Sequence, residues 1–518
     1  MGIYYRPKWT CGRYNASKRV ALMYNLLEGM CYFFEEMSAE IVNIILNAPK
    51  DSEINVAPII NRIPLDTSEI TIFLDHLQSI GLLTSNIPTN EDVRNYRKQI
   101  LTLNHQQENV IQRIDTTSPM ELDDAEMAYA EAIGGNIVAN VMFELTYSCS
   151  EKCIHCYNPG ATRNDSEEDT RKSRKELSLD DYKRIIDELC DLGLYKVCLS
   201  GGDPFSKNIV WEVIDYLYQK EIAFDIYTNG QSILYDIKKL AGYYPRLVGL
   251  SLYSGISEIH DSITRIKGSH KKSVAVMEQL SSFAIPMLLK CCIMRPNLKS
   301  YFTVKEIAKR YNAIPQFELN ITDSLEGDKC ASQQLRLTAE MMEVVLRDKD
   351  IASYVGLEAI NDGASQRTLD NRVCDAGNRS FCITPEGNLQ PCCAFPYSFG
   401  NLKEHTLSYL IQNNQDIHWL NKQTLRTFDE CGTHDYCTHC QICIGNNYNA
   451  HGTPLKASEN NCFLAKVRYN LAGKIKHGYD PLYGKSLQDR LQDFDIVLAP
   501  LQREGSINYR NPQKKLNG

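Results

Sequence analysis

The sequence predicts an α/β protein whose central parallel sheet is wrapped by helices, with a small α+β domain before it and a cysteine-rich domain after it. Three observations lead to this prediction. From residue 137 onward, short apolar runs alternate with helix-like segments, which is the pattern of a parallel sheet. The first 95 residues show three strand-like runs followed by three helix-like segments. Beyond residue 366, cysteines recur at short spacings typical of metal ligands.

The first predicted domain spans residues 1–95, and its strands are expected at 4–8, 19–25 and 30–35. Ser38 caps the first helix, the second covers residues 56–62, and the third begins after Asp66 and stops at Gly81. This winged-helix-like order, with the ending Leu-Gln-Ser-Ile-Gly-Leu-Leu83, resembles the peptide-recognition domain related to PqqD. The resemblance implies that a leader peptide adds a strand beside the small sheet, against the third helix. A generic winged helix or a structural cap is the alternative.

Residues 96–136 are polar, charged and partly helical in pattern, and we interpret them as a linker. The central domain is expected over residues 137–365. Its six predicted strands are residues 137–145, 196–200, 223–228, 247–252, 287–293 and 316–320.

Three cysteines, Cys149, Cys153 and Cys156, follow the first of these strands at the spacing C-x3-C-x2-C. Three thiolates on one short loop can hold three corners of a 4Fe-4S cube. Because no fourth cysteine is near in sequence, one iron is left open for a ligand, as in a catalytic metal site.

This motif resembles the signature of the radical S-adenosylmethionine (SAM) superfamily. The resemblance implies a partial (β/α)6 TIM barrel with its chemistry at the carboxyl ends of the strands. It also implies that the open iron chelates SAM. Gly201, Gly202 and Asp203 end the second strand, where the family usually has Gly-Gly-Glu-Pro to hold the SAM amino group. Asp203 keeps the charge of the usual glutamate, and a plain strand-to-helix turn is the alternative.

The same resemblance implies that Ser251 touches the ribose, that Arg265 pairs with the SAM carboxylate, and that Tyr157 shields the cluster. Each has an alternative. Asp261 and Arg265 can equally form an i,i+4 helix pair, and Tyr157 can be a packing residue. His260 is interpreted as a packed or surface histidine rather than a base.

Residues 366–470 resemble the SPASM extension, which binds two auxiliary 4Fe-4S clusters in radical SAM enzymes that act on peptides and proteins. Residues 383–392, with Gly387, are expected to form a hairpin that presents Cys392 at its end. The family pattern assigns the nearer cluster to Cys374, Cys392 and Cys443, with Cys382 as a candidate fourth ligand, and the farther cluster to Cys431, Cys437, Cys440 and Cys462.

Two points stay open in this assignment. The family's second ligand position in the farther group is His434 here, so either His434 or Cys437 binds iron. If Cys382 does not bind, the nearer cluster keeps an open iron. A structural zinc ribbon is the alternative use of these thiols. Residues 471–518 are expected to be a C-terminal tail. The remaining cysteines are interpreted as small buried hydrophobes: Cys11, Cys31, Cys190, Cys198, Cys291, Cys292 and Cys330.

Composition limits the partners. A net charge of −8 argues against nucleic acid, which is held through its phosphates. No apolar run reaches the length of a membrane span, and residues 1–19 carry tyrosines and charges where a signal peptide needs an apolar segment. We therefore expect a cytoplasmic protein that does not bind membranes. In that reducing compartment the 19 cysteines are better explained by clusters than by disulfides.

Together these features predict a radical SAM/SPASM oxidoreductase that modifies a ribosomally made precursor peptide, most simply by a thioether or carbon-carbon cross-link. A flavodoxin or ferredoxin is the expected reductant. Alternatives with the same clusters are formylglycine formation, epimerisation and small-molecule radical chemistry. Sulfatase-maturing relatives carry an aspartate where this chain has Cys393, which argues against formylglycine formation. An alternative of another class is a non-catalytic iron-sulfur redox sensor.

Overall fold

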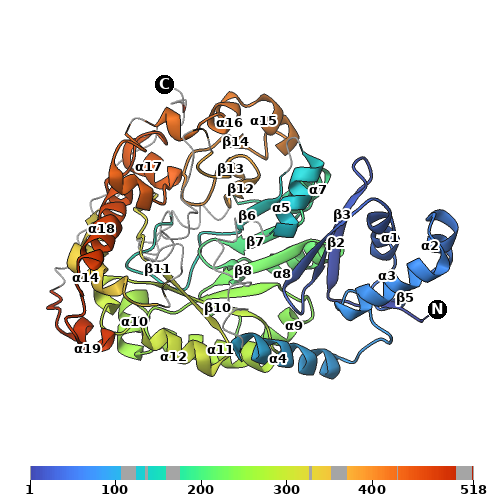
Figure 1. Ribbon diagram of the computed structural model, residues 1–518, viewed down its shortest axis with the longest axis horizontal. Helices are drawn as coiled ribbons and strands as arrows, with labels where there is room; N and C mark the ends of the chain where they lie inside the picture. Colours follow the sequence, from blue (N-terminus) through green and yellow to red (C-terminus); the bar gives the residue numbers. More distant parts are fainter. Residues whose placement is uncertain are drawn as a thin grey trace.

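A computed structural model describes residues 2–106, 124–134, 138–158, 176–325, 330–349, 351, 370, 372–428, 430–497 and 516. Figure 1 shows a small N-terminal domain beside a central sheet, with the C-terminal helices curving around the other side of that sheet. In the described part of the chain, no helix combines the length and apolarity needed to cross a membrane.

The N-terminal domain has the predicted order of three strands and three helices. Strands β2 (Thr10–Asn15), β3 (Val20–Asn25) and β4 (Met30–Glu35) form an antiparallel sheet, followed by α1 (Glu36–Leu46), α2 (Ala57–Arg62) and α3 (Thr67–Ser79). The prediction that residues 4–8 form the first strand of this sheet was wrong. Only β1 (Tyr5–Arg6) forms there, and it pairs with β5 (Ser52–Glu53). Pro7 has no N–H to continue a ladder, so the chain joins the main sheet three residues later.

The two faces of this small sheet pack on different partners. Ala21 and Met23 of β3 face the domain's own helices, whereas Leu22 and Tyr24 face the rest of the protein. Tyr195 and Ala223 lie in that second cluster, at the starts of two strands of the central sheet. The N-terminal domain is therefore docked on the amino-terminal end of the central sheet.

The segment predicted as a linker contains two helices, α4 (Asn90–Gln106) and α5 (Asp124–Ile133). Helix α5 packs against β3 and β4. Its Glu126 forms a buried ion pair of 2.8 Å with Lys196 of the central sheet and accepts a hydrogen bond from Tyr24. Helix α5 thus lies between the N-terminal domain and the central sheet and forms buried contacts with both.

The central sheet contains the six predicted strands, all parallel: β6 (Asn140–Glu144), β7 (Lys196–Ser200), β8 (Ala223–Thr228), β9 (Leu247–Ser251), β10 (Met287–Cys292) and β11 (Ile314–Glu318). Residue 137, the predicted start of the first strand, lies outside the described residues. Helices of this region are α7 (Leu179–Asp191), α8 (Val210–Gln219), α9 (Ile237–Ala241), α10 (Ser257–Thr264), α11 (Ser269–Ser282), α12 (Thr303–Arg310), α13 (Cys330–Leu335) and α14 (Ala339–Val345).

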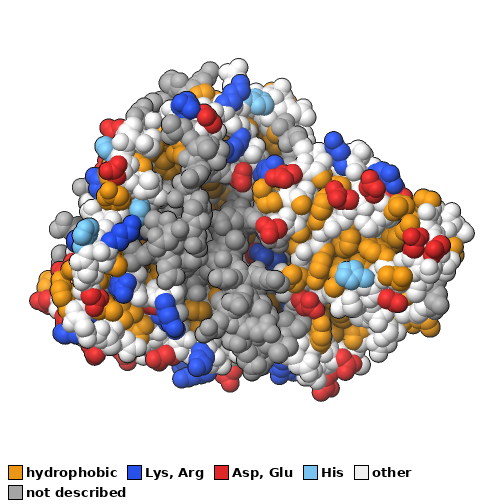
Figure 2. Space-filling model, viewed as in Figure 1, with side chains coloured by type: hydrophobic (Ala, Val, Ile, Leu, Met, Phe, Trp, Pro, Cys, Tyr) orange, Lys and Arg blue, Asp and Glu red, His pale blue; other side chains and the backbone are white. Residues whose placement is uncertain are grey.

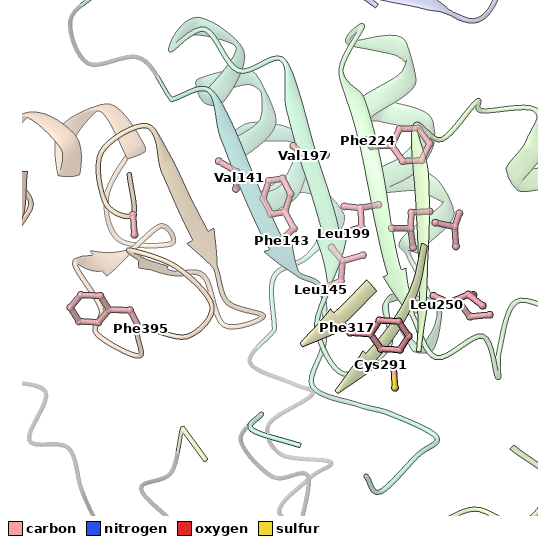
Figure 3. Packing of buried hydrophobic residues seen from close by; sticks show 14 of the residues in the cluster. Val141, Phe143, Leu145, Val197, Leu199, Phe224, Leu250, Cys291, Phe317 and Phe395 are labelled. Atoms are coloured by element: carbon pink, nitrogen blue, oxygen red, sulfur yellow. The ribbon is translucent and has the colours of Figure 1, made fainter. Parts of the chain in front are cut away.

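Alternate residues of each strand point to opposite sides of this sheet. Figure 3 shows one set, including Phe143, Val197, Phe224 and Leu250, which belong to the large hydrophobic core. The other set forms the inner side of the partial barrel, where Met142, Cys198 and Cys382 make a small separate cluster.

The C-terminal domain continues the same sheet. Strand β12 (Ser380–Ile383) pairs in parallel with β6, followed by β13 (Asn388–Gln390) and β14 (Gly400–Asn401) in antiparallel order. The predicted hairpin is therefore present, and Gly387 in its turn has a φ of +92°. The remaining helices are α15 (Leu407–Asn413), α16 (Gln415–Asn421), α17 (Ile444–His451), α18 (Glu459–Lys476) and α19 (Leu487–Gln492).

Two of the predicted domain boundaries can be compared with the structure, and two cannot. Those after residues 95 and 470 fall inside α4 and α18, and those after residues 136 and 365 lie outside the described residues. Helix α19, in the predicted tail, is packed through buried Leu491 and an ion pair from Arg490 to Glu340.

Candidate active site and metal centres

The loop with Cys149, Cys153 and Cys156 follows β6 at the carboxyl end of the sheet. Two backbone hydrogen bonds fix it to the last turn of α10. The amide of Lys152 donates to the carbonyl of Thr264, and that of Ile154 donates to the carbonyl of Ile263, each at 2.9 Å. These carbonyls have no partner within their own helix, so the loop satisfies the helix end while the helix positions the loop.

Gly201 and Gly202 lie against the first part of this loop. The amide of Gly202 donates to the carbonyl of Thr146 at 2.6 Å. A Cβ on Gly202 would lie 2.4 Å from the carbonyl oxygen of Ser148, and one on Gly201 would lie 2.3 Å from that of Thr146. We expected the glycines to admit a ligand, and the close neighbour in the structure is the cysteine loop itself.

Asp203 is fully buried and connects two strand ends. Its Oδ1 accepts from the amide of Phe205 at 2.9 Å, and its Oδ2 accepts from the hydroxyl of Thr228 at 2.7 Å and the amide of Asn229 at 3.1 Å. Burial raises its pKa. The contact between this residue and the SAM amino group stays a prediction. The structure shows that Asp203 holds the end of β8 in place.

Asn229, which sequence reasoning did not single out, reaches the cysteine loop directly. Its Nδ2 donates to Sγ of Cys149 at 3.2 Å, and the amide of Glu151 donates to the same sulfur at 3.4 Å. N–H donors of this kind stabilise metal-bound thiolates. The signal for Asn229 was its place in the Thr-Asn-Gly turn that ends the third predicted strand.

The thiols fit an iron-sulfur cluster in their chemistry. Burial raises the pKa of Cys149 to about 12 and that of Cys153 well above its usual range. Such thiols remain neutral unless a cation compensates the thiolate charge, and bound metal does so. Among the described residues, no three His, Cys, Asp or Glu side chains converge on the position of a single ion.

The other predicted SAM contacts lie around the same loop. Ser251 ends β9, and its side chain interacts with that of buried Tyr253. Arg265 caps α10 in the left-handed region, with φ of +58°, and its side chain is exposed next to the carbonyl that holds Lys152. The structure brings both residues to the loop but leaves their SAM contacts as predictions.

The alternative ion pair between Asp261 and Arg265 is not what the structure shows. Asp261 accepts from the amides of Gly268 and His270 and the hydroxyl of Ser269, at 2.5 to 3.0 Å, and so caps the start of α11. His260 is fully buried, and its Nδ1 accepts from the amide of Tyr253 at 3.2 Å. It is a packed histidine, as expected.

Tyr157 connects the cysteine loop to the C-terminal domain. Its hydroxyl interacts with the thiol of Cys393, and that thiol and burial raise the pKa of Tyr157 well above the usual range. The residue after the last cysteine of the loop therefore lies near the residue after Cys392.

The C-terminal thiols lie in two regions of the SPASM part of the chain. Cys392 interacts electrostatically with Cys374 and Cys443, and Cys431 interacts with Cys437, Cys440 and Cys462. Cys374 and Cys443 each accept a backbone N–H at 3.4 Å, from Ala376 and Asn446. Cys382 is buried inside the barrel beside Cys198, and the ring of His434 stacks on Tyr436 with centroids 4.8 Å apart. Iron ligation by each of these residues stays a prediction.

The comparisons with known proteins agree with this geometry. The model of the radical SAM superfamily matches residues 143–299, and that of the SPASM iron-sulfur cluster-binding domain matches residues 374–443. The chain is a radical SAM/SPASM enzyme. Its radical SAM domain thus contains the cysteine loop and the first strand ends, its SPASM domain contains the hairpin, and both are iron-sulfur domains.

The relatives of this radical SAM/SPASM enzyme include a subtilosin biosynthesis protein and a heme synthase. The subtilosin biosynthesis protein AlbA of Bacillus subtilis is 26% identical over 317 residues, 58% of this chain and 66% of AlbA, slightly less than two thirds. An AdoMet-dependent heme synthase of Methanosarcina barkeri is 22% identical over 61% of this chain and 94% of its own. The fold of Streptococcus suis SuiB, solved with its precursor peptide SuiA, matches with a TM-score of 0.53 at 12% identity, covering 88% of this chain and 99% of SuiB.

Residues on the inner side of the barrel escaped sequence reasoning. Glu144 of β6 is buried, accepts from the hydroxyl of Tyr147 at 2.9 Å, and has a pKa raised by burial to about 7. Lys290 of β10 and Tyr227 of β8 lie in contact there. Strict alternation along each predicted strand was the available signal, because it separates inner from outer positions.

Proposed function

We propose that this enzyme modifies a ribosomally made precursor peptide by radical chemistry. Cys149, Cys153 and Cys156 hold the SAM-cleaving 4Fe-4S cluster, with SAM bound along Gly201, Gly202, Asp203, Ser251 and Arg265. When bound, the iron-sulfur clusters supply the electron that splits SAM into methionine and a 5'-deoxyadenosyl radical, and accept the electron released when the substrate radical closes a new bond. The observation that carries the proposal is the continuity of the sheet from the cysteine loop into the SPASM hairpin.

This continuity supports a substrate space that is shared by the SAM-cleaving cluster and the auxiliary clusters. Cys156 and Cys392 are each followed by a residue, Tyr157 and Cys393, and the side chains of these two residues interact. A peptide inside the barrel then lies between the site where its hydrogen atom is taken and the site that takes up the leftover electron. A thioether or carbon-carbon cross-link needs both steps, so it is the product we propose.

We assign two auxiliary 4Fe-4S clusters to the SPASM domain, one on Cys374, Cys392 and Cys443 and one on Cys431, Cys437, Cys440 and Cys462. The assignment is supported by the interactions of Cys392 with cysteines of the first set and of Cys431 with cysteines of the second set. Cys437 is preferred over His434 because it interacts with Cys431 while the ring of His434 stacks on Tyr436. Cys382 faces the barrel interior, where it is either the fourth ligand or leaves an open iron for a substrate thiolate. A flavodoxin or ferredoxin reduces the enzyme.

We assign leader recognition to the N-terminal domain. Strand β4 is an edge of its sheet, and Phe34 on it packs edge-to-face on Phe73 of α3 with centroids 6.1 Å apart. Hydrophobic side chains gather on this domain in Figure 2, and Ile72 of α3 is 69% exposed. An unpaired strand edge beside an apolar helix face suits a peptide that binds as an added strand.

Anaerobic co-expression with each short peptide that is found encoded beside the gene tests this proposal. Mass spectrometry should find the peptide lighter by two hydrogen atoms for each ring closed. Replacement of Cys149, Cys153 and Cys156 by alanine should abolish the change. Ile72→Glu should weaken peptide binding at least tenfold, whereas Val497→Glu, an equally exposed apolar position outside the domain, should not. An unchanged peptide mass with active SAM cleavage would favour epimerisation or another substrate.

Small-molecule radical chemistry is the second candidate, and one observation favours it: a heme synthase is among the relatives. It predicts SAM cleavage that no peptide stimulates. Formylglycine formation is disfavoured by Cys393, which stands where sulfatase-maturing enzymes carry an aspartate. Formation of 5'-deoxyadenosine by the reduced protein would exclude a redox sensor without catalysis.

A further inference from the structure

Lys290 lies on the inner side of the barrel. Its neighbours on β10, Leu289 and Cys291, belong to the outer core, and Figure 3 shows Cys291 among that core's side chains. Alternation along the strand therefore directs Lys290 inward. It is largely but not completely removed from solvent.

Three strands cooperate to seat this lysine. Nζ of Lys290 lies 3.7 Å from the centroid of the Tyr227 ring on β8, which is a cation–π contact. Strand β9 runs between β8 and β10, and it carries Gly249 at the crossing. A Cβ on Gly249 would lie 2.6 Å from Cδ1 of Tyr227 and 3.3 Å from Cδ of Lys290. The missing side chain is what lets the ring and the lysine meet above the middle strand.

This ammonium lacks a close counter-charge among the described residues. Lys196 and Arg246, two other cations at the barrel, each form an ion pair with a carboxylate, Glu126 and Asp225. For Lys290 no carboxylate oxygen of the described residues lies within 4.0 Å. Glu318 of β11 acts on it only from a longer distance, and one Glu318 oxygen accepts the amide of Asn320 at 2.7 Å.

The surroundings of Lys290 make its ammonium charge energetically unfavourable without an anionic partner. Burial lowers the pKa of Lys290, and the thiols of Cys198, Cys292 and Cys393 interact with it. Thiols and an aromatic face stabilise an ammonium less than a carboxylate does, so an incoming anion would gain a desolvated partner already held in position.

We propose that Lys290, seated on Tyr227 above Gly249, binds a carboxylate of the substrate inside the barrel. For a peptide substrate this carboxylate is an Asp or Glu side chain or the C-terminus, next to the residue whose C–H bond is broken. The inference rests on the proposed function, and it adds a chemical requirement for the modified segment.

Turnover gives the first test. Wild-type enzyme, Lys290→Met, Lys290→Arg and a surface control, Lys271→Met, are each purified anaerobically and incubated with the precursor, SAM and a reductant. The ratio of modified peptide to 5'-deoxyadenosine should fall at least tenfold in Lys290→Met, recover partly in Lys290→Arg and stay at the wild-type level in Lys271→Met. Precursors with single Asp→Asn or Glu→Gln changes, and one with an amidated C-terminus, identify the carboxylate. The precursor change that removes the carboxylate bound by Lys290 should lower the ratio of modified peptide to 5'-deoxyadenosine with wild-type enzyme. With Lys290→Met the same change should cause no further decrease in this ratio. Equal ratios in wild type and Lys290→Met, or losses that add for every carboxylate, would overturn the proposal.

Binding gives a second test that needs no turnover, so it separates this inference from the proposed function. Cluster-reconstituted protein is titrated calorimetrically with N-acetyl-glutamate methylamide and its glutamine counterpart, and with N-acetylglycine and its amide. We expect at least a fivefold preference for one acid over its amide in wild type, lost in Lys290→Met and kept in Lys290→Arg. The absence of any acid preference, including absence of binding by all four compounds, refutes the carboxylate site. Failure of SAM cleavage or peptide modification in wild type, with the preference present, instead counts against the proposed function.

Discussion

Replacing Gly202 with alanine tests whether the strand-end glycines support the cysteine loop. The added Cβ would lie 2.4 Å from the carbonyl oxygen of Ser148, where ordinary contacts begin at 3.4 Å, so the loop must retreat by about 1 Å (3.4 − 2.4). That retreat breaks the hydrogen bonds from Gly202 to Thr146 and from Asp203 to Ser148. Two lost hydrogen bonds at about 1 kcal/mol each, with about 1–3 kcal/mol for overpacking, give about 3–5 kcal/mol.

This cost falls on the loop that we propose binds the cluster. We expect Gly202→Ala to keep its far-ultraviolet circular dichroism and lose most iron at the SAM site after anaerobic reconstitution. The assay uses a background with the seven SPASM thiols replaced, so that only one cluster is counted. Gly473→Ala is the matched control, because no atom lies within 4 Å of its Cβ position. If both variants bind equal iron and show the same spectral shift with SAM, the reasoning about the glycines is refuted.

Two further predictions concern other contacts. Glu126→Gln leaves Lys196 buried without its partner and should lower the free energy of unfolding by about 3–5 kcal/mol in urea titrations, whereas exposed Glu404→Gln should change it little. Burial alone raises the pKa of Glu126, but Lys196 outweighs it and holds the pKa below its ordinary value. This stabilisation is therefore complete above about pH 4.3 and is lost as the pH falls through the lowered pKa of the folded protein, so a wild-type advantage that does not decrease on acidification would contradict the assignment. Asn229→Ala removes an N–H donor to Cys149 and should lower the potential of the SAM-site cluster by about 40 mV, about 1 kcal/mol for one electron, in a redox titration followed by electron paramagnetic resonance. An unchanged potential would show that this hydrogen bond does not reach bound iron.

The central sheet was predictable because its signal is local. Strands such as residues 223–228 are short apolar runs bounded by turns, and the structure has β8 over the same residues. The first strand of the N-terminal sheet was missed because Thr10–Asn15 carries polar residues and Gly12, whose absent side chain lets the strand approach the carbonyl of Leu22. When a strand is buried only by contacts with distant parts of the chain, its own sequence need not show the apolar pattern of a strand.

Helix α5 shows the same limit for charge. Glu126 looked like part of a solvated linker because nothing in the local sequence indicates that Lys196, 70 residues later, will meet it. A charged residue is buried only when a partner is brought to it by the fold. Sequence reasoning about charge therefore fails at domain contacts more than within single helices.

The candidate site divides along similar lines. The cysteines were found because metal ligands require one residue type at fixed spacing, and this requirement survives in the sequence. Lys290, Tyr227 and Gly249 belong to three strands and have no spacing rule, since they meet across the sheet and not along the chain. The residues for the chemistry shared by radical SAM enzymes thus lie close together in the sequence, in the loop after β6. We propose that inward residues of neighbouring strands determine which substrate this enzyme accepts, so variants there should change selectivity while variants of the loop should abolish turnover.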